Sequence, residues 1–66
     1  MKIDKSVSVR ITVHQNGLFI GKSTDHANNL KDCKAIARHL IGQRSGSFNV
    51  SVHQEGGYFE TFNLKA

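Results

Sequence analysis

The 66-residue sequence contains no proline, only one cysteine and no long apolar run. The single cysteine, Cys33, excludes an internal disulfide framework and suits a reducing compartment, so the cytoplasm is the expected location. No apolar run approaches the roughly 20 residues that a membrane span requires. The first ten residues, MKIDKSVSVR, also lack the apolar core of a signal peptide. We therefore expect neither secretion nor membrane insertion.

The composition is that of one small folded domain. Hydrophobic residues make up 38% of the chain and charged residues 21%, which is typical of globular proteins and not of disordered ones. A chain of this length is only just able to build one core, so we expect a single domain over residues 1–66. Nine Lys and Arg against five Asp and Glu give a net charge of +4, which favours encounter with polyanions or acidic protein surfaces.

One stretch of the chain is repeated. The segment ITVHQNGLF at residues 11–19 returns as VSVHQEGGYF at residues 50–59. Apolar and polar residues alternate in both copies, which is typical of a half-buried strand, and each copy contains turn residues. The repeat predicts two β-hairpins related by an internal two-fold axis.

The first hairpin has the stronger turn signal. Alternation runs from residue 6 to residue 14, and Asn16-Gly17 then favours a two-residue type I′ turn because both positions tolerate a positive φ. We expect the second strand to cover about residues 18–23.

The turn at Asn16-Gly17 sets the register of that hairpin. It pairs Val13 with Ile20 on the inner face of the sheet. The same register pairs His14 with Phe19 on the outer face.

A helix follows the first hairpin. Asn29 can cap its start, and Asp32 three positions later imitates a capping box. Gly42 or Gly46 can end it. One apolar stripe at helical spacing would pack on the sheet: Leu30, Cys33, Ile36, Ala37, Leu40 and Ile41.

The second hairpin begins with alternation at residues 48–53, and two turn lengths compete for its connection. A three-residue connection over residues 55–57 pairs Val50 with Phe62 and, on the outer face, His53 with Phe59. It also pairs Phe48 with Leu64. A two-residue turn would set Val50 opposite Asn63, so the apolar residues of the two strands would no longer share one face of the sheet. We therefore expect the longer connection.

These elements predict an α+β fold of the ββαββ type. We expect a four-stranded antiparallel sheet in the order 2-1-3-4, with the valine-rich first strand central and the helix packed on one face. The face away from the helix should be open and should carry these residues: Ser6, Ser8, Arg10, Thr12, His14, Phe19, Gly21, Asn49, Ser51, His53, Phe59, Thr61 and Asn63.

Two interpretations of the outward His/Phe pairs are open. Each Phe can simply pack against the His of its own hairpin and stabilise it. Alternatively the aromatic residues and an arginine form a docking face, because such side chains anchor interfaces and stack on bases. The candidate binding residues on the sheet are Arg10, His14, Phe19, His53 and Phe59.

The helix offers a second candidate surface. Lys31, Lys34 and Arg38 cluster along one flank of its apolar stripe. Such a flank is either a solvated charged surface or a contact for phosphates or an acidic partner.

The residues that catalysis would need are not grouped. Cys33 lies on the apolar stripe, where a cysteine is usually an inert core residue, and the GQRSGS loop at residues 42–47 has neither P-loop nor nucleophile-elbow spacing. The four histidines and the cysteine lack the spacing of a zinc site. We expect no catalytic residues, no metal, no cofactor and no enzymatic activity.

The layout of the chain resembles that of a known class. In the order and spacing of GLFIGKST, LKDCKAIARHL and FNVSVHQEGGYFETFNL, it is similar to small phage-encoded anti-CRISPR proteins, several of which carry an antiparallel sheet with one helix between hairpins. The resemblance implies a stoichiometric, non-enzymatic inhibitor whose basic face occupies part of a large nucleoprotein. It carries over no individual residue.

We therefore expect a small binding protein, of phage or mobile-element type, that occupies the surface of a nucleoprotein or other host complex. The competing hypothesis is a module that binds DNA or RNA directly with the same surfaces, with affinity that falls steeply with salt. A homodimer through the open face or an edge strand is compatible with either hypothesis.

Overall fold

The computed structural model describes residues 3–4 and 6–66. Of the expected domain of residues 1–66, residues 1, 2 and 5 lie outside the described part. The sheet order is β2-β1-β3-β4 with antiparallel neighbours, which confirms the expected ββαββ topology. The elements are β1 (Val9–Gln15), β2 (Leu18–Asp25), α1 (Leu30–Ile41), β3 (Ser47–His53) and β4 (Phe59–Lys65).

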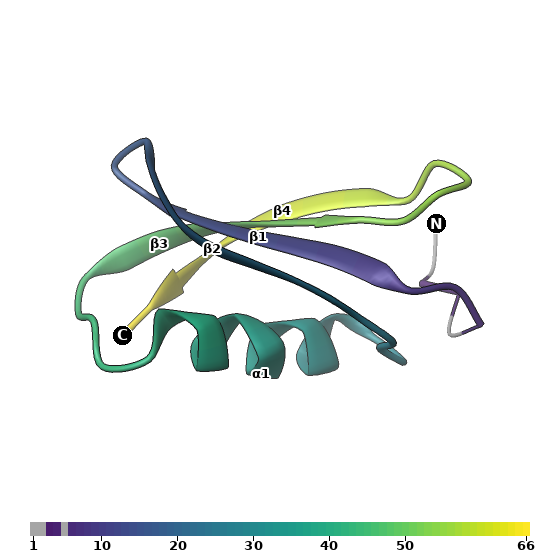
Figure 1. The fold of residues 1–66 in the computed structure, drawn as a ribbon, viewed down its shortest axis with the longest axis horizontal. Helices are drawn as coiled ribbons and strands as arrows, with labels where there is room; N and C mark the ends of the chain where they lie inside the picture. Colours follow the sequence, from purple (N-terminus) through teal and green to yellow (C-terminus); the bar gives the residue numbers. More distant parts are fainter. Residues whose placement is uncertain (1–2, 5) are drawn as a thin grey trace.

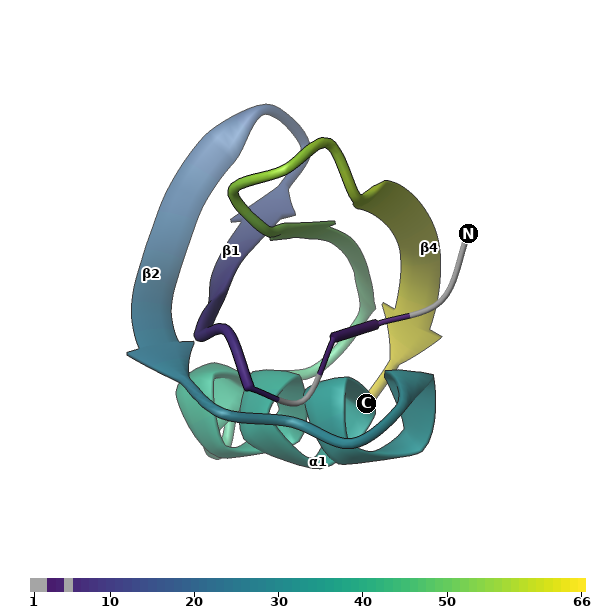
Figure 2. The ribbon, with the colours of Figure 1, turned by 90° about the vertical axis from the view of Figure 1, so that its right-hand side faces the viewer.

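The helix covers one face of the sheet and leaves the other face open. In Figure 1, α1 runs beneath the strands, and the turns of the two hairpins lie at opposite ends of the sheet, both lifted away from the helix. Figure 2 shows the sheet arching over α1, with the edge strands β2 and β4 on either side. The open face therefore lies between two raised hairpin turns.

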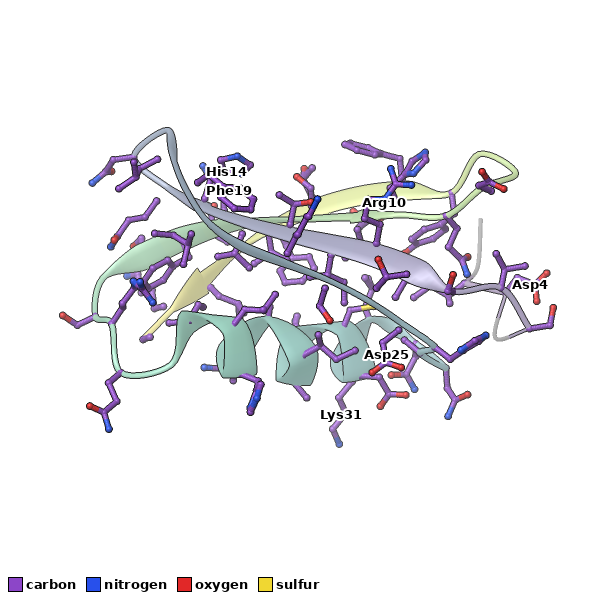
Figure 3. All side chains as sticks on the ribbon, in the orientation of Figure 1. Asp4, Arg10, His14, Phe19, Asp25 and Lys31 are labelled. Atoms are coloured by element: carbon purple, nitrogen blue, oxygen red, sulfur yellow. The ribbon has the colours of Figure 1, made fainter. Side chains whose placement is uncertain are left out.

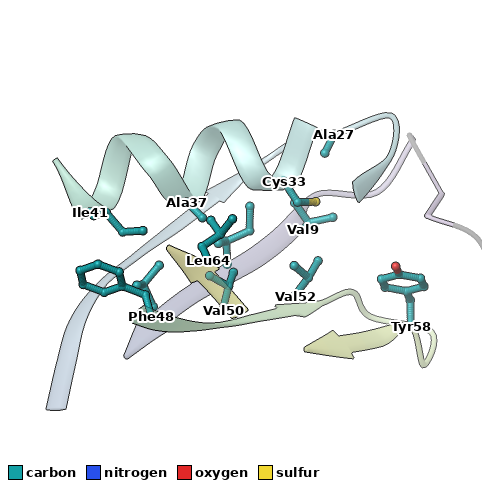
Figure 4. Packing of buried hydrophobic residues seen from close by; sticks show 12 residues of the cluster. Val9, Ala27, Cys33, Ala37, Ile41, Phe48, Val50, Val52, Tyr58 and Leu64 are labelled. Carbon is teal, nitrogen blue, oxygen red and sulfur yellow. The ribbon is translucent and has the colours of Figure 1, made fainter. Parts of the chain in front are cut away.

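The core fills the space between α1 and the two central strands (Figure 4). Every second residue of β1 and β3 points into it, because successive side chains of a strand alternate between faces. Burying one Val or Ile side chain stabilises the fold by about 1.5–3 kcal/mol. The completely or almost completely buried residues from these elements are Val9, Ile11, Val13, Cys33, Ala37, Ile41, Phe48, Val50 and Val52.

The helix has the expected caps. Asn29 has extended backbone angles, and its side chain accepts a hydrogen bond from the Asp32 N–H at 3.0 Å. The Asp32 carboxylate accepts from the Asn28 N–H at 2.9 Å, one residue earlier than in a standard capping box. Gly42 closes the helix with φ 64°, and its N–H donates to the Arg38 carbonyl at 3.1 Å.

The first hairpin has the expected turn but contains a bulge. Asn16 and Gly17 have φ angles of 51° and 79°, as a type I′ turn requires, and His14 lies opposite Phe19. The expected pairing of Val13 with Ile20 is wrong: Val13 lies opposite Gly21, and the register shifts at this point. Ile20 is the extra residue of a β-bulge.

This bulge moves the rest of β2 to the opposite phase. Gly21, expected on the open face, faces the helix instead, where an added Cβ would lie 3.6 Å from Leu40. Lys22 and Thr24 lie opposite Thr12 and Arg10 and therefore belong to the open face.

The first strand is shorter and the second longer than expected. β1 begins at Val9 instead of Ser6, because the Asp4 carboxylate accepts from the Ser6 N–H at 2.9 Å and from its hydroxyl at 2.6 Å and so forms a turn. These two bonds hold the pKa of Asp4 below its usual value. Ser6 is thus not part of the open face, and β2 continues to Asp25.

The second hairpin has the expected register. Val50 lies opposite Phe62 and His53 opposite Phe59. Phe48 likewise lies opposite Leu64, so the three-residue connection is confirmed.

The two hairpins are related by a pseudo-two-fold axis at the centre of the sheet. Thr12 of β1 and Ser51 of β3 lie opposite one another there. The same interval of 39 residues separates His14 from His53 and Lys22 from Thr61. The first hairpin has its extra residue in the bulge and the second has it in the turn, so the two registers coincide again beyond both insertions.

Candidate binding surface

The open face consists of the strand residues that point away from α1. Its sequence-predicted members Arg10, His14, Phe19, His53 and Phe59 all lie on it, three of them labelled in Figure 3. Lys22 was missed because the bulge at Ile20 is not visible in the alternation, and Thr24 because the second strand was expected to end near residue 23. Ser47 and Lys65 were also not among the expected members. In full, the open face comprises Arg10, Thr12, His14, Phe19, Lys22, Thr24, Ser47, Asn49, Ser51, His53, Phe59, Thr61, Asn63 and Lys65.

The open face has a His/Phe pair at each of two diagonally opposite corners. The ring centroids of His14 and Phe19 are 5.7 Å apart at an angle of 73°, and those of His53 and Phe59 are 6.2 Å apart at 62°. Both contacts are edge-to-face, so each pair does pack across its own hairpin. Phe19 nevertheless remains 52% exposed and Phe59 62% exposed. More than half of each phenylalanine is therefore available to a partner.

Between the corners, the surface is hollowed in two places. The larger hollow, of about 600 Å³, has an amide and hydroxyl lining that includes Asn49, Ser51 and Asn63. The smaller, of about 180 Å³, lies at the Arg10 and His53 end. The first can exchange hydrogen bonds with a polar ligand, and the second presents a guanidinium to an anion.

Charge is distributed unequally between the two faces of the sheet. The carboxylates of the strands, Asp25 and Glu60, lie on the helix side, opposite Val9 and Val52 respectively. Arg10, Lys22 and Lys65 lie on the open face. Within the four strands, which are described in full, the open face therefore carries only positive formal charge.

The basic flank of the helix is a separate surface. Lys34 places its Nζ 5.5 Å from the centroid of the Phe62 ring, and Arg38 Nη1 donates to the Lys65 carbonyl at 3.4 Å. Both side chains therefore contact β4, on the helix side of the sheet. Lys31 is exposed and points away from the sheet in Figure 3. The structure does not bring these three residues together with the candidates on the open face.

The repeated glutamine has a structural role that the sequence reasoning missed. Gln54 is only 2% exposed; its Oε1 accepts from the Asp4 N–H at 3.0 Å, and its Nε2 donates to the carbonyls of Asp4 and Val7 at 2.7 Å each. Its counterpart Gln15 donates to the Ser45 carbonyl at 3.0 Å. Each glutamine thus holds the segment that leads into a central strand. The repeated His-Gln dipeptide was the available signal, with His outward and Gln inward.

Leu18 is a second feature that the sequence reasoning missed. It is 67% exposed at the end of the first hairpin and lies opposite Gln15, on the helix side. It is therefore not part of the open face, although it neighbours Phe19 in the sequence.

The residues capable of metal or nucleophilic chemistry are dispersed or buried. Among residues 3–4 and 6–66, no three His, Cys, Asp or Glu side chains are grouped closely enough to hold a metal ion. Cys33 is completely buried, and this burial, with the nearby negative charge of Asp32, raises the pKa of its thiol. A raised pKa disfavours the thiolate, which is the nucleophilic form.

No helix in the described part of the chain is both long and apolar enough to cross a membrane. Comparison of the chain with protein-family models, with curated proteins and with solved structures found no match.

Proposed function

We propose that this protein is a small non-enzymatic binding protein that acts by occupying the surface of an anionic partner, and that this partner is a nucleoprotein or another host complex. The observation that carries the proposal is the open face, which exposes Phe19 and Phe59 at its corners and has positive charge without strand carboxylates. Exposed aromatic residues and arginine are the usual anchors of protein interfaces. The resemblance in layout to anti-CRISPR proteins favours stoichiometric inhibition as the mode of action.

The surroundings of the reactive groups support a binding role. Cys33 is enclosed in the core, and among the described residues no three His, Cys, Asp or Glu side chains are grouped closely enough to hold a metal ion. The lone cysteine also suits action in a reducing compartment, and we place the protein in the cytoplasm on that basis.

The proposal is tested by capture from a host lysate with matched baits. Wild-type protein, a Phe19→Ala/Phe59→Ala double variant and a Leu18→Ala variant are compared, because all three residues are exposed but only the two phenylalanines lie on the open face. We expect the Leu18→Ala bait to retain a stoichiometric partner and the double variant to lose it. Equal capture by all three baits would contradict binding through the open face.

Sedimentation of each bait on its own controls for self-association. A homodimer formed through the open face would be lost in the Phe19→Ala/Phe59→Ala variant, whereas one formed through an edge strand would persist.

A further inference from the structure

The open face has the features of a platform for unpaired nucleotides, and this observation deepens the proposed function, on which it rests. We infer that the open face binds single-stranded nucleic acid, with bases stacked on Phe19 and Phe59 and phosphates beside Arg10 and Lys22. The single strand is then the part of an anionic partner that the protein recognises.

The two phenylalanines are placed to contact two bases that lie some distance apart along one nucleic-acid strand. Phe19 and Phe59 lie on the two edge strands, in rows four residues apart along β1. At the usual strand rise and spacing this diagonal is about 20 Å. Surfaces of this size in other folds bind about 4–16 nucleotides of single strand. Several nucleotides can therefore cross the face between the two rings.

The floor between the rings suits the edges of bases. The lining of the larger hollow includes, together with His14, Gly17 and Phe62, the amides of Asn49 and Asn63 and the hydroxyls of Ser51 and Thr61. These groups both donate and accept hydrogen bonds, as the edges of unpaired bases do. An acidic protein surface would instead require cations here.

Two of the three cations of the open face lie together on one side of the floor, whereas Lys65 lies on β4, at the other side. Arg10 on β1 and Lys22 on β2 occupy neighbouring rows on adjacent strands, so they can contact consecutive phosphates. The smaller hollow adds the hydroxyls of Ser8 and Thr24 beside Arg10. Glu55, in the turn, also lines this hollow, so we place the phosphates toward Lys22 and away from the turn.

Single strands are favoured over duplexes by the exposed rings. The bases of a duplex are already stacked on one another, whereas unpaired bases can be splayed out and stacked on aromatic side chains. The edge-to-face contacts with His14 and His53 hold the two rings in place while leaving more than half of each Phe exposed.

The inference is tested by fluorescence anisotropy with labelled oligo(dT) and oligo(rU) of about 12 nucleotides, and with a duplex of equal length, at about 50 mM salt. We expect the single strands to bind more tightly than the duplex. Phe19→Ala and Phe59→Ala should each weaken binding roughly 5- to 150-fold, the range for loss of one stacked base. Phe59→Tyr, which keeps the ring, should bind like wild type.

Two further variants separate the phosphate contact from net charge. Arg10→Gln should reduce the slope of log affinity against log salt by about 0.7, the value for one phosphate of a single strand. Lys31→Gln removes the same charge from the far side of the molecule and should leave the slope unchanged. Leu18→Ala is the control for an exposed apolar residue and should bind within about twofold of wild type.

The outcomes distinguish this inference from the proposed function. No binding to single strands at about 50 mM salt, equal binding to the duplex, or unchanged affinity in both Phe→Ala variants overturns the inference. If the lysate partner nevertheless survives nuclease treatment and is lost only in the Phe19→Ala/Phe59→Ala variant, the proposed function stands with a protein surface as its target.

Discussion

Replacing Gln54 with methionine should remove the hydrogen bonds by which this side chain, just after β3, holds Asp4 and Val7, which precede β1. Methionine, like glutamine, is unbranched and of similar length, so the change removes hydrogen bonds while nearly conserving side-chain volume. Among the described residues, Gln54 makes three such bonds, with the N–H of Asp4 and with the carbonyls of Asp4 and Val7. At a net value of about 1 kcal/mol for each bond, the unfolding free energy should fall by about 3 kcal/mol.

This is a large part of the total stability. A domain of 66 residues has an unfolding free energy of about 3–10 kcal/mol at the usual value per residue. For a urea slope of about 1 kcal/mol per molar, the midpoint of unfolding should fall by about 3 M. Urea denaturation followed by circular dichroism measures this shift.

Gln15→Met is the matched control. Gln15 occupies the equivalent position in the first hairpin, but within residues 3–4 and 6–66 its side chain makes one hydrogen bond, an exposed one to the Ser45 carbonyl. The free energy of unfolding should therefore fall by at most about 1 kcal/mol. Equal shifts in the two variants, or a shift below about 0.5 kcal/mol for Gln54→Met, would refute the role given to Gln54.

Three further predictions concern the turn, the helix cap and the buried thiol. Gly17→Ala should lower the free energy of unfolding, measured by urea denaturation, by about 1–2 kcal/mol because Gly17 has φ 79°. Gly21→Ala should leave this free energy nearly unchanged because its methyl would lie in ordinary contact with α1. Equal decreases in the two variants would contradict the turn assignment. Asn29→Ala should lower the free energy of unfolding by about 1 kcal/mol through loss of the N-cap, and should therefore lower the melting temperature. An unchanged melting temperature would show that the cap contributes nothing. Burial and Asp32 raise the pKa of Cys33, so its contribution to stability is complete below the unfolded thiol pKa of about 9 and is lost as pH rises toward the folded value. Urea titrations from pH 8 to 10 should therefore show a decline that is smaller in Cys33→Ala, and identical profiles would contradict it.

The alternation of residues was sufficient to predict the sheet and its central strands. Val9, Ile11 and Val13 alternate with polar residues, and their burial in the structure follows directly from the two-residue period of a strand. The register of the second hairpin followed in the same way, because only the three-residue connection places Phe62 opposite Val50.

The bulge in β2 could not be predicted from the same pattern. Leu18, Phe19 and Ile20 form a continuous apolar run, which is compatible with either phase of a strand. The phase is set by packing against the helix, where Gly21 of β2 faces Leu40, and this contact lies outside the range of local sequence patterns. Lys22 was consequently missed as a member of the open face.

The start of β1 was misplaced for a similar reason. Alternation continues through Ser6, but the Asp4 carboxylate binds Ser6 locally and Gln54 binds Asp4 from 50 residues away. A buried glutamine that hydrogen-bonds a distant backbone leaves no periodic signal. The candidate residues on the strands could be placed because their orientation depends only on alternation and turn length, whereas Lys34 and Arg38 could not be placed relative to β4 without the structure.

Binding through the open face is tested most directly by nuclear magnetic resonance of the ring protons of His14, Phe19, His53 and Phe59 during titration with a single-stranded oligonucleotide or with the captured partner. These rings occupy two corners of the open face and more than half of each Phe is exposed, so we expect all four ring systems to shift together while Lys31 and Leu18 are unchanged. Shifts confined to the helix, with all four ring systems unchanged at saturation, would contradict the assignment of the open face as the binding surface.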